Sequence, residues 1–182
     1  RQLVAVYGQQ ISPDGTKVLY VRQRTDFAKD SYDTVLMLYD MTSHGSRVLS
    51  DRRGLSGAQW TPSGNAVVFT APGTDGKTTA SQIFVMPMNG GDPKQVTDFP
   101  HGVRSFALSP NGKTFAVLTN DDNPNQAQMK AHLDVFEVGN NDYLHTSATP
   151  SVHLWLLPAN GGTARRLTEG AWSAALVNPN YA

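Results

Sequence analysis

Short apolar runs alternate with polar turns along the whole chain, and three of the turns share one phrase. The phrase appears as Ser12-Pro13-Asp14-Gly15, Thr61-Pro62-Ser63-Gly64 and Ser109-Pro110-Asn111-Gly112, and each copy leads directly into an apolar run. The three prolines lie 49 and then 48 residues apart. A fixed period of that size indicates one supersecondary unit that is copied along the chain. The repeat therefore predicts the fold before any single residue does.

Each copy of the unit predicts four β-strands. One strand precedes the Pro turn and a second follows it. A second apolar run begins about twenty residues after the turn, and then come a turn of small residues and a short strand that ends in an acid. The second apolar runs are residues 35–40, 83–87 and 153–158, and the short strands are residues 47–51, 94–98 and 165–169. Val, Leu, Phe, Trp, Tyr and Thr dominate these runs, as is typical of strands, and no long apolar stripe has a helical period.

Four antiparallel strands at this spacing are one blade of a β-propeller, so we expect an all-β chain that forms a partial propeller. A β-sandwich is the alternative, but it gives no reason for the turn phrase to recur at a constant interval. The predicted division places one propeller domain over residues 1–182. The expected blades are residues 1–54, 55–101 and 102–170, and the first strand of a fourth blade begins in residues 171–182.

Three blades and one strand leave sheet edges and faces without neighbours. Closed propellers typically have four or more blades, and open edges leave backbone N–H and C=O groups without partners. We therefore expect the chain to be part of a larger molecule, completed by further sequence or by another chain. The first residue is Arg1, so the sequence gives no information on a leader or on targeting.

Composition excludes several classes of function. Fifteen basic and fifteen acidic residues balance, and no basic stripe is interleaved with aromatic residues, so we do not expect a nucleic-acid partner. No apolar run is long enough to cross a bilayer, so no membrane partner is expected. The chain has no cysteine, which excludes disulfides, thiolate zinc sites and a cysteine nucleophile. The five histidines show no metal-ligand spacing, and we expect neither a metal nor a cofactor.

The third blade departs from the repeat through one long connection. Residues 120–152 replace the shorter stretch 71–82 of the second blade and add about twenty residues to it. Connections of this length are usually functional or disordered. The insertion starts with a polar, turn-prone segment and continues as an apolar and acidic pattern that predicts an extra hairpin. Its candidate substrate-binding residues are Asp134, Glu137, Asp142 and Tyr143. The competing interpretation is an edge hairpin whose acids are merely solvated.

Two segments resemble catalytic or phosphate-binding motifs and fail on context. Gly54-Leu55-Ser56-Gly57-Ala58 is close to a nucleophile elbow, but the expected helix does not follow it. Residues 71–78 are close to a phosphate loop, but Ala71 replaces the first glycine and a strand follows. His153 lies next to Leu154 and Trp155, so we expect a strand residue with an ordinary hydrogen bond. The sequence thus predicts no catalytic residue in this chain.

The longer phrases resemble a known family. The blade phrase is shared by bacterial propellers in general, including the TolB protein of the Tol system. The insertion segment 134–144, the strand 153–158 and the stretch 165–172 are more specific, and they look like the propeller of prolyl oligopeptidase family serine peptidases. The similarity points to the bacterial dipeptidyl aminopeptidase and acylaminoacyl-peptidase branch and covers essentially the whole chain.

The resemblance carries expectations about function. In this family a propeller covers an α/β-hydrolase domain that holds the catalytic triad, so the expected partners are such a domain of the same protein and a peptide substrate. It implies a propeller portion that admits short peptides, is inactive alone and belongs to a bacterial periplasmic or secreted protein. Relatives that remove dipeptides hold the substrate amine with propeller carboxylates, and Glu137 with Asp134 is the candidate here.

Two alternatives remain open at this stage. One is a TolB-like periplasmic propeller that binds proteins and performs no chemistry. The other is a lyase or glycan-active propeller with its own central pocket. That second alternative needs acid–base groups on the innermost strands, where Gln59, Trp60, Ser105 and Phe106 offer few.

Overall fold

A computed structural model describes residues 3–74, 79–132 and 150–174. These residues form three four-stranded antiparallel sheets, each made of strands that are consecutive in sequence. The first sheet contains β1 (Val4–Ile11), β2 (Lys17–Asp26), β3 (Ser31–Asp40) and β4 (Gly45–Ser50). The second contains β5 (Ser56–Trp60), β6 (Ala66–Pro72), β7 (Ser81–Pro87) and β8 (Lys94–Gln95). The third contains β9 (Ser105–Leu108), β10 (Thr114–Asn120), β11 (Val152–Pro158) and β12 (Arg165–Arg166).

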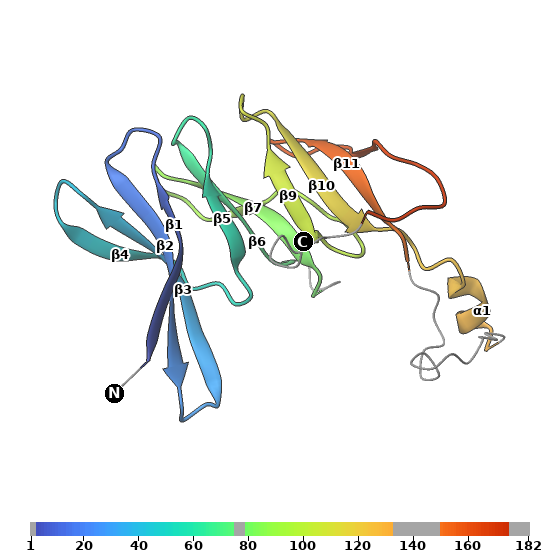
Figure 1. Ribbon diagram of the computed structural model, residues 1–182, viewed down its shortest axis with the longest axis horizontal. Coiled ribbons are helices and arrows are strands. Elements are labelled where there is room, and N and C mark those ends of the chain that lie inside the picture. Colours follow the sequence, from blue (N-terminus) through green and yellow to red (C-terminus); the bar gives the residue numbers. More distant parts are fainter. Residues whose placement is uncertain (1–2, 75–78, 133–149, 175–182) are drawn as a thin grey trace.

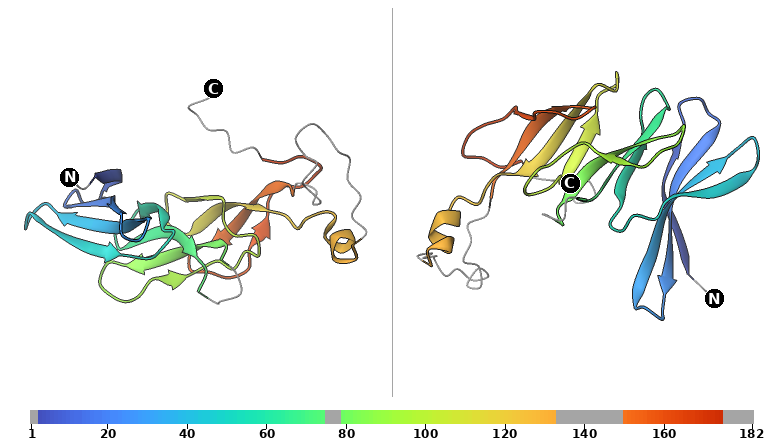
Figure 2. Two further views of the ribbon diagram at one scale, coloured as in Figure 1. Left: turned by 90° about the horizontal axis from the view of Figure 1, so that it is seen from below. Right: turned by 180° about the vertical axis from the view of Figure 1, so that it is seen from behind.

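The sheets lie in a row in chain order and do not close on themselves (Figures 1 and 2). The predicted all-β, partial-propeller architecture is confirmed. The turns between the first and second strands lie at one end of the sheets, and the connections between the second and third strands lie at the other (Figure 1). In the described part of the chain, no helix combines the length and the apolar character needed to span a membrane.

The repeated turn phrase has the same backbone geometry in each sheet. In the first copy, the amide of Ser12 donates to the carbonyl of Lys17 and the amide of Gly15 donates to the carbonyl of Ser12, both at 2.8 Å. Equivalent bonds recur in the other two copies. The turn glycines have φ between 69° and 72°, the left-handed conformation that glycine adopts most easily. The sequence repeat is thus a structural repeat.

Alternation along each strand places apolar side chains on both faces of the second sheet. Val67 and Phe69 pack toward the first sheet, whereas Val68 and Ile83 pack toward the third. Two separate hydrophobic clusters result, one at each junction between neighbouring sheets. Phe69 and Phe84 stack at a centroid distance of 5.7 Å within the first cluster. Both faces of the second sheet are therefore covered.

The long connection of the third sheet contains one element that the sequence did not predict. Gln126–Lys130 forms a short helix, α1, directly after the stretch 120–126 that the sequence predicts to be polar and turn-prone. The residues of α1 include several good helix formers, but five residues are too few to show a helical period. None of the residues of α1 is buried.

The chain leaves the third sheet in the way that it leaves the second. The amide of Val103 donates to the carbonyl of Ser81, and the amide of Ala174 donates to the carbonyl of Val152, at 2.6 and 2.9 Å. Ser81 and Val152 occupy the same place at the start of β7 and β11. The predicted start of a fourth blade lies mainly in residues 175–182, outside the described residues, and the predicted blade boundaries stay a prediction.

Candidate functional site

The sequence placed its candidate substrate-binding residues in the insertion of the third sheet. Asp134, Glu137, Asp142 and Tyr143 all lie in residues 133–149, outside the described residues. Their role stays a prediction. Two hollows among the described residues join different sheets at places that bear on function: one lies between the second and third sheets, and one lies over the first strands of all three sheets.

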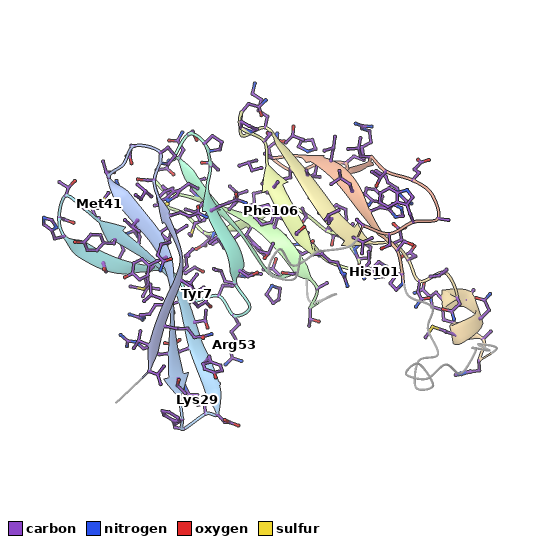
Figure 3. The ribbon with its side chains drawn as sticks, in the orientation of Figure 1. Tyr7, Lys29, Met41, Arg53, His101 and Phe106 are labelled. Carbon is purple, nitrogen blue, oxygen red and sulfur yellow. The ribbon has the colours of Figure 1, made fainter. Side chains whose placement is uncertain are left out.

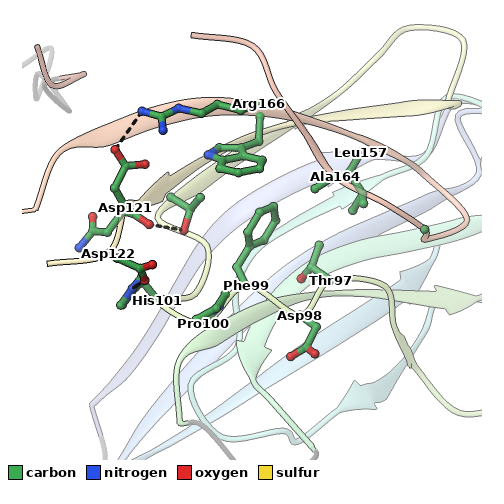
Figure 4. A pocket seen from close by; sticks show the side chains of 14 residues that line it. Thr97, Asp98, Phe99, Pro100, His101, Asp121, Asp122, Leu157, Ala164 and Arg166 are labelled. Carbon is green, nitrogen blue, oxygen red and sulfur yellow. Dashed lines mark hydrogen bonds and ion pairs between the residues drawn. The ribbon is translucent and has the colours of Figure 1, made fainter. Parts of the chain in front are cut away.

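The hollow between the second and third sheets, called the inter-sheet pocket below, has a volume of about 620 Å³. Phe99, Trp155 and Leu157 supply its apolar wall (Figure 4). The rings of Phe99 and Trp155 meet edge to face with centroids 6.0 Å apart. Phe99 comes from the connection that crosses from the second sheet to the third, so this connection closes one side of the pocket.

A charged cluster borders the inter-sheet pocket. Asp121 follows β10, His153 lies on β11 and Arg166 lies on β12, so three neighbouring chain segments contribute one group each. Asp121 Oδ2 lies 2.7 Å from His153 Nδ1. The same oxygen lies 3.0 Å from Arg166 Nη2 (Figure 4). Arg166 Nη2 also lies 2.7 Å from His153 Nδ1. The carboxylate thus holds the guanidinium and the imidazole together.

Two tautomers of His153 match different parts of this geometry. A proton on Nδ1 donates to Asp121 at 2.7 Å, whereas a bare Nδ1 accepts from Arg166 at 2.7 Å. In either tautomer Arg166 can donate to Asp121 at 3.0 Å. The other ring nitrogen, Nε2, is buried and has no hydrogen-bond partner among the described residues. The rings of Trp172 and His153 meet edge to face, with their centroids 5.1 Å apart.

This geometry is structural rather than catalytic. The expectation that His153 is a strand residue is confirmed, and its bond is to a carboxylate. A histidine that acts as a general base needs an accessible nitrogen next to a nucleophile. His153 is 1% exposed, and no hydroxyl of a described residue bonds to its ring. The cluster could not be predicted from the sequence, because its members lie up to 45 residues apart.

The second sheet contains the neutral counterpart of this cluster. Gln82 holds the place in β7 that His153 holds in β11, and Gln95 holds the place of Arg166. Gln82 accepts hydrogen bonds from the hydroxyl of Thr97 and the amide of Phe99, and it donates to the carbonyl of Phe99. The Gln82 set ties β7 to the chain that leaves the second sheet, whereas the charged cluster ties β11 to β12 and to the end of β10. An alignment of the repeats would have located the charged cluster.

The rim of the inter-sheet pocket carries a further histidine pair. His101 Nε2 lies 2.8 Å from Asp122 Oδ1, at the entrance to the long connection (Figure 4). Both side chains are solvent-accessible, so the pair is a surface interaction of small energetic weight. No group of three His, Asp or Glu side chains among the described residues is arranged to hold a metal ion.

The second hollow lies over the first strands β1, β5 and β9, and we call it the first-strand hollow. Its volume is about 490 Å³. These three strands are edge strands of their sheets, so their outer backbone groups are open to a ligand. Tyr7 on β1 and Phe106 on β9 are labelled in Figure 3, and both line the hollow.

The segment that resembles a nucleophile elbow forms part of the first-strand hollow. Ser56 lies on β5, and Gly57 has φ of 61° at a β-bulge between Ser56 and Gln59. The Ser56 hydroxyl lies 3.0 Å from the Thr70 hydroxyl, so it is paired to a neighbouring strand and not to a base. β5 leads directly into the next Pro turn and β6. The structure thus supports the prediction that this segment is not a nucleophile elbow, because a strand and not a helix follows it.

In the segment that resembles a phosphate loop, residues 75–78 lie outside the described residues, and residues 71–72 are the end of β6. β6 and β7 pair with each other in antiparallel register from Ala66 with Pro87 to Pro72 with Ser81. A phosphate loop instead opens a helix. The flanking strands support the interpretation as a hairpin connection.

A scan against protein-family models found no match. The chain is 30% identical over 122 residues to the uncharacterized peptidase YuxL of Bacillus subtilis, an alignment that covers 63% of this chain. The chain spans only 17% of the length of that relative.

Solved structures with a similar fold include peptidase propellers. Acylaminoacyl peptidase of Pyrococcus horikoshii matches with a TM-score of 0.63 and 12% identity, over 91% of this chain and 25% of that one. The β-propeller domain of the trilobed protease of Pyrococcus furiosus matches with a TM-score of 0.58 and 12% identity, over 93% and 45%. Putative TolB of Agrobacterium tumefaciens matches with a TM-score of 0.57 and 19% identity, over 89% and 48%.

Identities this low between structures establish the fold, and the sequence match to a peptidase adds the family resemblance. The three sheets and their neighbours agree on a propeller that the described residues leave open. The comparisons confirm that this chain resembles the β-propeller portion of prolyl oligopeptidase family serine peptidases.

Proposed function

We propose that this chain is the non-catalytic propeller portion of a serine peptidase and that it controls which peptides reach a separate α/β-hydrolase domain. The observation that carries the proposal is the 30% identity to peptidase YuxL, of which this chain spans 17%. The described residues supply a rigid scaffold for such a role. They show no nucleophile paired with an accessible base, so the chemistry would belong to another domain.

A filter works by size, because a ring of stacked sheets has an opening that is fixed by side-chain packing. Each junction between sheets is a continuous apolar cluster, which resists the separation that a folded protein would require for entry. A short extended peptide can pass along the open edges of β1, β5 and β9 and bind their backbone groups. The architecture therefore favours passage of short, unfolded chains.

The decisive experiment compares this chain with the longer protein that contains it. The longer protein should hydrolyse short chromogenic peptides and spare a folded substrate of the same sequence content, whereas this chain alone should show no hydrolysis. Equal cleavage of unfolded and folded versions of one substrate would contradict the filter. A longer protein without peptidase activity would contradict the whole proposal.

The acidic residues of the insertion give the proposal a second test. If Glu137 with Asp134 holds a free substrate amine, Glu137→Gln in the longer protein should raise KM for free-amine peptides more than for N-blocked ones, because only the former lose a charge-assisted hydrogen bond. Glu169→Gln is the matched control, since Glu169 is exposed at the end of the third sheet. Equal changes for both substrate classes would remove Glu137 from the site.

A TolB-like binding propeller is the second candidate. It is supported by the structural match to putative TolB of Agrobacterium tumefaciens, which this chain covers to 48%. Such a protein would bind partners and lack hydrolytic activity. The same hydrolysis assay separates the two, because only the peptidase should turn over a peptide.

A further inference from the structure

The charged side chains that line the first-strand hollow are all of one sign. It is lined by residues from β1, β2, β5, β6 and β9 and from the segments that lead into β5 and β9. Its lining contains one charged side chain, the guanidinium of Arg104, and no carboxylate. The hollow therefore carries a net positive charge, although the chain as a whole is neutral.

Arg104 is held at this place and is not neutralised there. Its backbone amide donates to the carbonyl of Leu118 at 2.9 Å, which fixes the residue directly before β9. Its side chain is exposed and makes no ion pair with any described residue. Arg166, by contrast, is paired with Asp121 at 3.0 Å in the third sheet. Arg104 thus retains its full set of donors for a ligand.

Two neutral donors in the same hollow are also unengaged. The hydroxyl of Ser105 and the amide of Gln59 form no side-chain hydrogen bond with the described residues, and both line the hollow. The side chains of Gln10, Ser56 and Thr70, which also line the hollow, are engaged in hydrogen bonds. Gln10 donates to the carbonyl of Ala58, and the Ser56 hydroxyl pairs with Thr70. Both free groups can donate as well as accept, and no acid in the lining balances the charge of Arg104.

The walls of the first-strand hollow limit the size and polarity of a ligand that could bind next to Arg104. Tyr7, Val21, Leu55 and Phe106 supply apolar surface beside the polar groups. A volume of about 490 Å³ suits one or two amino-acid residues better than a polymer. Gly57 lies close to the Phe106 ring, since a Cβ at this position would be 3.4 Å from it. The lining thus fits a small group that has an apolar stem and a negatively charged end.

We infer that the first-strand hollow is a subsite for a peptide carboxylate, bound by the Arg104 guanidinium with Ser105 and Gln59 as additional donors. Arginine presents a planar fork that matches a carboxylate with two parallel hydrogen bonds. The peptide nature of the ligand rests on the proposed function. The carboxylate is a C-terminus or an acidic side chain, and these share the recognition chemistry.

The test measures binding to this chain directly and needs no catalysis. Three probes are titrated by calorimetry or by NMR: acetyl-Gly-Ala with a free C-terminus, its C-terminal amide, and acetyl-Glu-amide, whose only carboxylate is in the side chain. At least one carboxylate probe should bind about tenfold or more tightly than acetyl-Gly-Ala-amide, because a charge-assisted pair is lost in the amide. The tighter of the two carboxylate probes identifies the source.

Arg104→Gln should abolish this preference, so that the three probes bind within about twofold of one another. Arg165→Gln is the matched control, because Arg165 is exposed on β12 and lies outside the hollow. That control should keep the full preference. Arg104 is exposed, and an unchanged urea midpoint will show that its substitution leaves the fold intact.

Equal binding of acid and amide probes by the unsubstituted chain would overturn the inference, as would a preference that survives Arg104→Gln. Failure of the proposed function has a different signature. A longer protein without peptidase activity, together with Arg104-dependent carboxylate binding, refutes the peptidase and keeps the subsite. Peptidase activity without carboxylate preference refutes the subsite alone.

Discussion

Gly102 offers a sharp test of how the second and third sheets are joined. It lies in the connection between them with φ of 70°. A Cβ at this position would lie 2.9 Å from the Ala80 Cβ and equally close to the Ser81 amide nitrogen and carbonyl oxygen. Two of these atoms are backbone at the start of β7, so no rotamer change can relieve the contact. Gly102→Ala must therefore displace the connection or the strand.

The magnitude follows from two separate costs. A left-handed conformation costs an alanine about 1 kcal/mol relative to glycine. Overpacking against an immobile backbone adds about 1–3 kcal/mol. Gly15→Ala isolates the first cost, because Gly15 has φ of 72° and nothing within 4 Å of the added methyl group. Gly102→Ala should thus be more destabilising than Gly15→Ala by about 1–3 kcal/mol.

Urea denaturation of the two variants measures this difference. With a slope of about 2 kcal/mol per molar urea, the Gly102→Ala midpoint should fall about 0.5–1.5 M further than that of Gly15→Ala. The hydrogen bonds around Gly102 should weaken at the same time, since Val103 donates to Ser81 and the Thr119 hydroxyl donates to the Gly102 carbonyl, both at 2.6 Å. Equal midpoints for the two variants would show that the connection can move freely, against this reasoning.

Two further predictions concern pH and the open face of the third sheet. Hydrogen bonds from the Ser12 hydroxyl, and from the backbone and hydroxyl of Thr16, lower the pKa of Asp14 from 3.8 to about 2. The stability contributed by its carboxylate is present above pH 3.8 and is lost as the pH falls toward 2. In Asp14→Asn the urea midpoint should therefore decrease less between pH 5 and pH 2 than it does in the unsubstituted chain. An equal decrease in both proteins would contradict the assignment. Ile83→Ala should cost about 2–5 kcal/mol by chemical denaturation, because Ile83 is fully buried. Leu154→Ala, at the equivalent position of the third sheet, should lower the free energy of unfolding by less than half of that amount. Equal losses in the two variants would mean that the face of the third sheet that carries Leu154 is already covered.

Most of the fold could be predicted because the repeat is local in sequence. Pro13 and Gly15 define a turn, and the strand that follows is rich in β-branched and aromatic residues. Each of these signals is contained within about ten residues, and three copies at one interval reinforce them. The helix α1 was missed for the opposite reason, since its five residues occur once.

The sites were less accessible to sequence reasoning, because they combine residues from different repeats. Asp121, His153 and Arg166 meet only after β10, β11 and β12 have paired. The first-strand hollow likewise needs three sheets in place before Gln59, Arg104 and Ser105 surround one space. Neither Gln59 nor Ser105 has a group suited to acid–base chemistry, so the sequence gives no reason to select them. Their value lies in hydrogen-bond donation next to a guanidinium, which no single strand reveals.

The separation of the two hydrophobic clusters has a consequence for how such a chain can acquire function. Each sheet is stabilised by its immediate neighbours, through Leu19 and Leu36 at the first junction and Val68 and Ile83 at the second. The equivalent residues of the third sheet are only partly buried, so they would pack against one more sheet: Ala116, Leu118, Leu154 and Leu156. Because stability is added junction by junction, a long connection at the end of one sheet leaves the other junctions unchanged. The insertion after β10 and Arg104 before β9 can therefore vary while the packing between sheets stays the same.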